Sequence, residues 1–153
     1  MADYAKLLGL RGARILDVGI AGDEKPSGNY KYFGEGNDWK TLDKFDYYNP
    51  DIVADIVDSD IPDNSFDLVI LSNTIEHIWD FKKAVSEIMR ITKTYFIVDC
   101  PFMYPYHGFC EDTEFDDYWR ISATAFKKLV EEMGGEVMEA TQTDIFTSIL
   151  GKK

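Results

Sequence analysis

The chain has 153 residues, of which 45% are hydrophobic, which is enough for one well-buried core and too few for two ordinary domains. Its formal net charge of -12 disfavours nucleic acids and anionic membranes as partners, because both would be repelled. A neutral or cationic small ligand is easier to accommodate. We therefore expect a single domain spanning residues 1–153.

The sequence shows no secretory signal and no apolar run long enough to cross a bilayer, so we expect a cytoplasmic protein without a membrane partner. Cys100 and Cys110 form neither a Cys-x-x-Cys pair nor part of a dense cysteine framework. We predict that both are reduced thiols, with no structural disulfide and no metal site. A homo-oligomer is compatible with these features.

Five segments are rich in apolar residues and end in polar or turn residues, which indicates buried strands. They lie at residues 15–18, 40–45, 51–56, 66–72 and 95–99. A final antiparallel pair is expected at residues 136–140 and 145–150. This order of segments predicts an α/β fold with a mostly parallel sheet and a terminal antiparallel hairpin.

Helices are predicted between and before these strands. A short amphipathic helix at residues 2–8 stops at Gly9. Asp80 is the expected N-cap of a helix with one apolar face, and Ser122 begins another helix that Gly134 ends. All three are expected to cover the sheet.

The crossover between the first two strands is unusual for such a fold. Residues 23–40 contain Pro26 and three glycines, with little helical periodicity. We therefore expect the first crossover helix to be shortened or absent.

The first strand ends in Asp17-Val18-Gly19-Ile20-Ala21-Gly22-Asp23, which predicts a tight turn. Open α/β sheets bind ligands at the carboxyl ends of their strands, near the point where the strand order reverses, so this turn is a candidate site. An ordinary glycine turn is the alternative, because a short glycine-rich turn is a weak signal.

Further motifs follow in a definite order. Asp43 and Asp55 each follow a strand-like segment, a Phe-Asp-Leu-Val strand leads to the pair Glu76-His77, and Tyr-Pro-Tyr-His-Gly precedes Asp-Tyr-Trp-Arg at residues 117–120. In this order the chain, from about Arg14 to Gly134, resembles the class I S-adenosylmethionine-dependent methyltransferases, in particular their compact branch. The family pattern Asp-x-Gly-x-Gly-x-Gly differs here, with Ala21 and Asp23 at its second and third glycine positions.

The resemblance implies a three-layer Rossmann-like fold, S-adenosyl-L-methionine as cofactor, and methyl transfer to a small-molecule acceptor through an oxygen or nitrogen nucleophile. It also implies a set of cofactor-binding residues: Asp17, Gly19, Ala21, Gly22, Asp43, Asp55, Ile56, Ser72 and Asn73.

Asp43 is placed to accept hydrogen bonds from the ribose hydroxyls of an adenosine, the role that an acid has in dinucleotide-binding sheets. The alternative is a solvated charge at the end of a strand. Asp55 and the backbone of Ile56 resemble the place where the family holds adenine, and Asp58 is a competing candidate. Asp17 is expected to orient the turn beside the methionine amine.

Ser72 and Asn73 follow the fourth strand and are expected to face the reacting end of the cofactor, or else simply to end the strand. His77 and His107 are the two histidines of the chain and are expected at the same edge of the sheet. A histidine there can accept a proton from the acceptor during methyl transfer. We predict His107 as this catalytic base.

His77, Tyr106 and Arg120 are predicted to contact the substrate, and the loop of residues 102–120 is expected to cover the acceptor side. Each has a structural alternative. His77 could be a capping residue beside Glu76, and Arg120 could pair with Asp116 or Asp117. The aromatic side chains of the loop could pack only against one another.

Two other functions compete. A non-catalytic adenosyl-binding or regulatory protein with a degenerate methyltransferase fold would fit the altered glycines and the short first crossover. A nicotinamide-dependent oxidoreductase fits less well, because Asp23 would lie against the pyrophosphate that such enzymes hold at a helix N-terminus.

Overall fold

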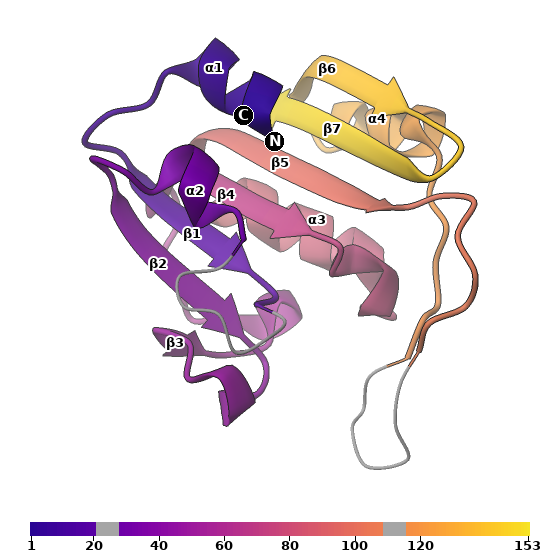
Figure 1. Cartoon of the computed structure of the whole chain (residues 1–153), viewed down its shortest axis with the longest axis horizontal. Coiled ribbons are helices and arrows are strands. Elements are labelled where there is room, and N and C mark those ends of the chain that lie inside the picture. Colours follow the sequence, from indigo (N-terminus) through magenta and orange to yellow (C-terminus); the bar gives the residue numbers. More distant parts are fainter. Residues whose placement is uncertain (21–27, 109–115) are drawn as a thin grey trace.

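A seven-stranded sheet with the order β3-β2-β1-β4-β5-β7-β6 forms the centre of the computed structural model, which describes residues 1–20, 28–108 and 116–153 (Figure 1). The strands are β1 (Arg14–Val18), β2 (Asp38–Asp43), β3 (Ile52–Val53), β4 (Phe66–Ser72), β5 (Thr92–Pro101), β6 (Glu136–Gln142) and β7 (Phe146–Lys152). The first five strands pair in parallel, and β7 runs antiparallel to both β5 and β6. The expected mostly parallel sheet with a terminal antiparallel hairpin is confirmed.

The helices lie on both faces of the sheet, which gives three layers. They are α1 (Ala2–Leu8), α2 (Tyr30–Phe33), α3 (Phe81–Ile91) and α4 (Ala123–Glu132). Figure 1 shows α3 and α4 behind the sheet and α1 and α2 in front of it. No helix in the described part of the chain is long and apolar enough to cross a membrane.

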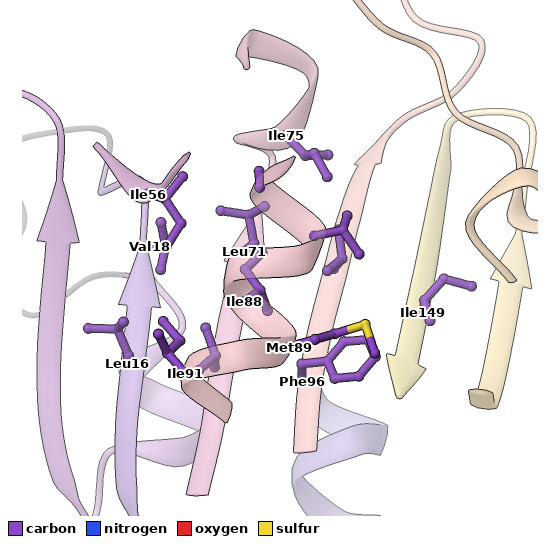
Figure 2. Close-up of a cluster of buried hydrophobic side chains, with 14 of the residues drawn as sticks. Leu16, Val18, Ile56, Leu71, Ile75, Ile88, Met89, Ile91, Phe96 and Ile149 are labelled. Carbon is purple, nitrogen blue, oxygen red and sulfur yellow. The ribbon is translucent and has the colours of Figure 1, made fainter. Parts of the chain in front are cut away.

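The larger core lies between the sheet and the layer of α3 and α4. Asp80 caps α3 through its side chain, which accepts a hydrogen bond from the backbone N–H of Lys83. Ile88 and Ile91 of α3 are fully buried, and Figure 2 shows them beside Leu16 of β1 and the other labelled side chains of this cluster. Each such side chain contributes about 1.5–3 kcal/mol through burial. This packing holds β1 and β4 in a fixed position.

The opposite face has a smaller core, because its helical layer is thin. Tyr4 of α1 and Phe33 of α2 pack there against Ile15, Leu68 and other sheet residues. In the described part of the crossover between β1 and β2, α2 has only four residues. The expected shortening of the first crossover helix is therefore confirmed.

The lengths of β3 and β5 differ most from the sequence expectation. β3 is only two residues long because the Asp55 side chain accepts a hydrogen bond from the N–H of Val57 and begins a 3-10 turn at Ile56–Asp58. β5 extends through Pro101 because its pairing with β7 continues as far as Phe146. Non-local pairing, which the local pattern does not report, therefore sets the end of β5.

Of the two cysteines, Cys100 is buried on β5 with a free thiol, and burial raises its pKa to about 12. Cys110 lies outside the described residues.

Candidate active site

The strand register brings several predicted site residues to one edge of the sheet. Val18 at the end of β1 pairs with Leu42 of β2 and with Leu71 of β4. The next residues of the three strands are Gly19, Asp43 and Ser72, so they emerge at the same level. This is the carboxyl edge, where open α/β sheets bind their ligands.

A cavity of about 940 Å³ opens at this edge. Ligand cavities commonly measure about 300–1,000 Å³, so this one is large enough for a nucleoside-sized ligand and a small second molecule. Its lining includes six predicted site residues: Gly19, Asp43, Asp55, Ile56, Asn73 and His77. The structure therefore brings these six residues to one cavity.

Gly19 forms the turn after β1 with a φ of 78°, a left-handed conformation that favours glycine. Its N–H donates to the carbonyl oxygen of Leu42 over 2.9 Å. A β carbon at this position would collide with the side chain of Thr74. The turn can therefore lie close to Thr74 only because residue 19 has no side chain.

Asp17 is buried, with an exposed fraction of 2%, and does not belong to the residues that line the cavity. Its Oδ1 accepts a hydrogen bond from Asn29 Nδ2 over 3.1 Å. The contact connects the end of β1 to the crossover segment. Ala21 and Gly22, the remaining predicted residues of the turn, lie outside the described residues.

Asp43 lies at the end of β2 with both carboxylate oxygens hydrogen-bonded to backbone amides. Its Oδ2 accepts from the N–H of Ile20 over 3.0 Å, and its Oδ1 accepts from the N–H of Phe45 over 2.9 Å. Burial raises the pKa of Asp43. The carboxylate thereby joins the turn after β1 to the loop after β2, and each oxygen keeps lone pairs for a ligand in the cavity.

Asp55 and Ile56 lie further along the same wall of the cavity. Asp55 Oδ2 is 3.5 Å from Lys44 Nζ, while Oδ1 accepts from the N–H of Val57 over 3.1 Å. Asp58, the competing candidate, is exposed and lies outside this cavity's lining.

Ser72 and Asn73 differ in what they contact. The Ser72 hydroxyl donates to Asp99 Oδ1 over 3.0 Å and is not part of the cavity lining. Asn73 lines the cavity, has a φ of 47°, and donates its N–H to the carbonyl oxygen of Asp99 over 3.1 Å. Burial raises the pKa of Asp99 to about 6.

Aromatic side chains form much of the remaining wall, and of these only Tyr118 belongs to the loop that was expected to cover the acceptor side. They are Phe45, Tyr47, Tyr48, Trp79 and Tyr118. The sequence feature that could have predicted this aromatic wall is the run of Phe45, Tyr47 and Tyr48 shortly after Asp43. Flat apolar rings beside a carboxylate suit a ligand with a planar base and a hydroxylated sugar.

The two histidines come together as expected, with ring centroids 5.0 Å apart. His77 Nδ1 is 2.6 Å from the carbonyl oxygen of Asp116, and His107 Nδ1 is 2.9 Å from Asp117 Oδ2. His77 lines the cavity and His107 does not. The His107 side chain is 31% exposed.

Arg120 pairs with Asp117, one of the two partners that the sequence left open. Its hydrogen bond holds the pKa of Asp117 at about 2, so this carboxylate is ionised at neutral pH. Arg120 also donates to the carbonyl oxygens of Tyr104 and Pro105. Tyr106 is 69% exposed, donates its hydroxyl to Asp116 Oδ1 and lies outside the cavity lining.

Glu76 is a buried carboxyl group that the sequence analysis named only as a neighbour of His77. Its exposed fraction is 0%, and neither side-chain oxygen has a hydrogen-bond partner within the described residues. Burial raises the pKa of Glu76 to about 7. The backbone N–H groups of Tyr118 and Trp119 donate to its carbonyl oxygen and so fix the return of the loop above it.

The sheet order, the carboxyl-edge cavity and its acid-lined wall define a class I methyltransferase site. Comparison with known proteins agrees. Residues 5–96 match the family model described as a methyltransferase domain. The chain belongs to this family and is an S-adenosylmethionine-dependent methyltransferase domain.

Solved structures share the fold. An S-adenosylmethionine-dependent methyltransferase from Mesorhizobium loti is 14% identical, with a TM-score of 0.71, and the match covers 100% of this chain and 98% of that one. A corresponding enzyme from Aquifex aeolicus is 18% identical, with a TM-score of 0.67 and coverages of 98% and 89%.

The 1,6-didemethyltoxoflavin-N1-methyltransferase from Burkholderia thailandensis, solved with 1,6-didemethyltoxoflavin and S-adenosylhomocysteine, is 14% identical, with a TM-score of 0.73 and coverages of 99% and 75%. No curated protein sequence gives a significant match.

Proposed function

We propose that this methyltransferase acts on a small-molecule acceptor through an oxygen or nitrogen nucleophile. The observation that carries the proposal is the cavity at the carboxyl edge, which Asp43 lines on one wall and His77 on another. A cavity of about 940 Å³ can hold the cofactor together with a small acceptor. The net charge of -12 also disfavours a nucleic acid.

The residues on the β1–β3 side fit the adenosyl part of the cofactor. Asp43 is the proposed partner of the ribose hydroxyls, and Asp55 with the backbone of Ile56 is the proposed partner of adenine. The aromatic side chains Tyr47 and Tyr48 lie on the same side of the cavity lining and fit a planar base. S-adenosylmethionine supplies a methyl group on a positively charged sulfur, and the acidic lining favours that charge.

Asn73 and His77 are proposed to lie beside the reacting groups. Methyl transfer needs the nucleophile in line behind the methyl carbon, and such positioning can lower a barrier by about 7–11 kcal/mol. His107 is the proposed base, with Asp117 as the carboxylate that orients it. As the acceptor forms its new bond, His107 Nε2 would take the proton that the nucleophile loses, through a water molecule, because His107 does not line the cavity.

The first test is isothermal titration with S-adenosylmethionine, S-adenosylhomocysteine and NAD. We expect the two adenosyl compounds to bind and NAD to fail. Small hydroxyl and amine compounds are then screened with methyl-labelled cofactor. Transfer to a protein or nucleic acid, with none to small molecules, would contradict the proposal.

With an acceptor in hand, His107→Ala should lower kcat by about 100-fold, a typical contribution of general base catalysis, while the Kd for S-adenosylhomocysteine stays unchanged. An unchanged kcat would remove His107 from proton transfer and leave positioning as the mechanism.

A non-catalytic adenosyl-binding protein is the second candidate, favoured by the four-residue α2 where a full crossover helix is usual and by Ala21 and Asp23 in the turn. This candidate predicts binding of S-adenosylhomocysteine without transfer to any acceptor class.

A further inference from the structure

We propose that Glu76, His77 and His107 form a binding site for a divalent transition-metal ion such as Zn²⁺. The sequence analysis predicted no metal site, because the cysteine spacing gave no motif. The three side chains come from two segments that lie far apart in sequence, and their ligand atoms all lie within 4.8 Å of one another. The methyl-transfer proposal uses His77 and His107 without a metal, and neither it nor the family match assigns a metal ion to this cluster.

The distances between the ligand atoms fit a metal site. Glu76 Oε1 is 3.6 Å from His77 Nε2 and 3.7 Å from His107 Nε2. Nitrogen and oxygen ligands about 2.1 Å from a tetrahedral Zn²⁺ lie about 3.4 Å from one another. Two of the three edges are thus within a few tenths of an ångström of that geometry. The same distances are too long for direct hydrogen bonds.

The outer contacts direct the Nε2 atom of each imidazole toward Glu76. The carbonyl oxygen of Asp116 can only accept, so His77 Nδ1 carries the hydrogen of that 2.6 Å contact. His107 Nδ1 likewise lies 2.9 Å from Asp117 Oδ2, an acceptor on the side of the ring away from Nε2. In each neutral ring Nε2 then has a lone pair. Histidine ligands of metals are held in this way, with Nδ1–H donated to a carbonyl or a carboxylate.

Glu76 completes the donor set. Its side chain is fully buried, and both oxygens lack a hydrogen-bond partner in the described part of the chain. An ionised carboxylate buried opposite two nitrogen lone pairs is unfavourable, and a cation between them offsets that cost, as does protonation of the carboxyl. A divalent cation satisfies all three atoms at once.

The chemistry of the ligands selects the class of ion. Two imidazoles and one carboxylate suit Zn²⁺ and its neighbours, whereas Mg²⁺ prefers oxygen ligands and water. Three protein ligands leave an open position, as in catalytic zinc sites. His77 lines the cavity, so an acceptor oxygen could occupy that position. This role of the metal in holding the acceptor rests on the proposed function. It also changes one part of that proposal, because His107 then binds the metal and does not act as the base.

The test is isothermal titration of Zn²⁺ into tag-free protein that has been treated with a chelator and desalted. We expect one equivalent to bind, and binding to weaken by at least about 10–100-fold in Glu76→Gln and in His107→Ala. Asp117→Asn, which removes the carboxylate beside His107 Nδ1 together with its ion pair to Arg120, should weaken binding by about 10–100-fold. Glu132→Gln is the matched control, because this glutamate is 63% exposed on α4.

Circular dichroism checks the fold of each variant, and His107→Ala still decides the outcome if Glu76→Gln does not fold. Zn²⁺ binding no tighter in the parent than in His107→Ala would overturn the proposal, as would a stronger response to Mg²⁺ than to Zn²⁺. S-adenosylhomocysteine binding is measured on the same samples. A parent protein that binds S-adenosylhomocysteine but not Zn²⁺ would therefore reject the metal site and leave the proposed function unaffected.

Discussion

The carbonyl oxygen of Gly19 lies 3.4 Å from Thr74 Oγ1, and a β carbon on residue 19 would collide with the same threonine. The turn after β1 and the segment after β4 thus touch at a point where the cavity begins. Both residues line that cavity.

Gly19→Ala should therefore destabilise the protein by about 2–5 kcal/mol, the sum of a left-handed backbone and an overpacked contact. Gly134→Ala is the matched control, because Gly134 has a φ of 85° and a β carbon added there would meet nothing within 4 Å. It should lose only about 1–2 kcal/mol. Urea unfolding measures both. Equal losses of unfolding free energy in the two variants would show that Thr74 can move away from the added β carbon at no energetic cost.

Asp43→Ala should weaken S-adenosylhomocysteine binding by about 10- to 150-fold, because a charged acceptor of ligand hydroxyls contributes about 1.5–3 kcal/mol. Asp46→Ala, an exposed acid in the same loop, is the control and should leave the Kd unchanged. Isothermal titration measures both. If the Kd of Asp43→Ala is also unchanged, Asp43 serves only to hold the amides of Ile20 and Phe45.

Arg120→Ala should cost about 2–4 kcal/mol of unfolding free energy at pH 7, because it leaves the carboxylate of Asp117, 1% exposed, without its cationic partner. Arg120→Lys should recover part of this loss, since lysine keeps the charge and loses the planar fork.

The pair also has a pH signature. The folded pKa of Asp117 is lowered to about 2 from 3.8, so its stabilising contribution is present above pH about 4 and is lost as the pH falls towards 2. Unfolding measured at pH 7 and pH 3 should show the difference between parent and Arg120→Ala shrinking. A constant difference would mean that Arg120 acts mainly through its contacts with Tyr104 and Pro105.

Asp99→Asn should stabilise the protein near neutral pH. The folded pKa of Asp99 is raised to about 6 from 3.8 by burial, so the folded state holds a proton more tightly than the unfolded chain, and stability falls as the pH rises between these values. A shift of about two units corresponds to up to about 3 kcal/mol. Asparagine is neutral at every pH and its side-chain oxygen can still accept from Ser72.

The measurement is urea unfolding of parent and Asp99→Asn from pH 4 to pH 7.5. The gain in the variant should grow between pH 4 and pH 6 and then level off. A gain that is the same at every pH would place its origin in packing and not in ionisation.

The sequence was sufficient for the fold because β1, β4 and the middle of β5 are apolar runs bounded by polar or turn residues, and because the order of the motifs resembles a known family. Once β1, β2 and β4 are parallel, Gly19 and Asp43 must emerge at the same edge, so their meeting could be predicted without coordinates. The meeting of the two histidines followed from the same argument, since each comes after a parallel strand.

The parts of the site that could not be predicted from the sequence depend on contacts between distant segments. Asp99 meets Ser72 only through the register of β4 and β5, which pairs these two residues. Asp117 orients His107 because the loop after β5 returns over Glu76, and no local pattern gives the path of that loop. The burial of Glu76 follows from the same return. Local periodicity gives the faces of strands and helices, but it does not give which polar groups a long loop will bury.

The position of β7 has a consequence for synthesis on the ribosome. β7 lies between β5 and β6 although it follows both in the chain. While β6 emerges, it cannot take its final place in the sheet, because its neighbour β7 has not yet been made. β5 meanwhile presents an unpaired edge, which is a surface prone to aggregation. Therefore α4 and β6 reach their final positions only after β7 (Phe146–Lys152) has been synthesised and has paired with β5.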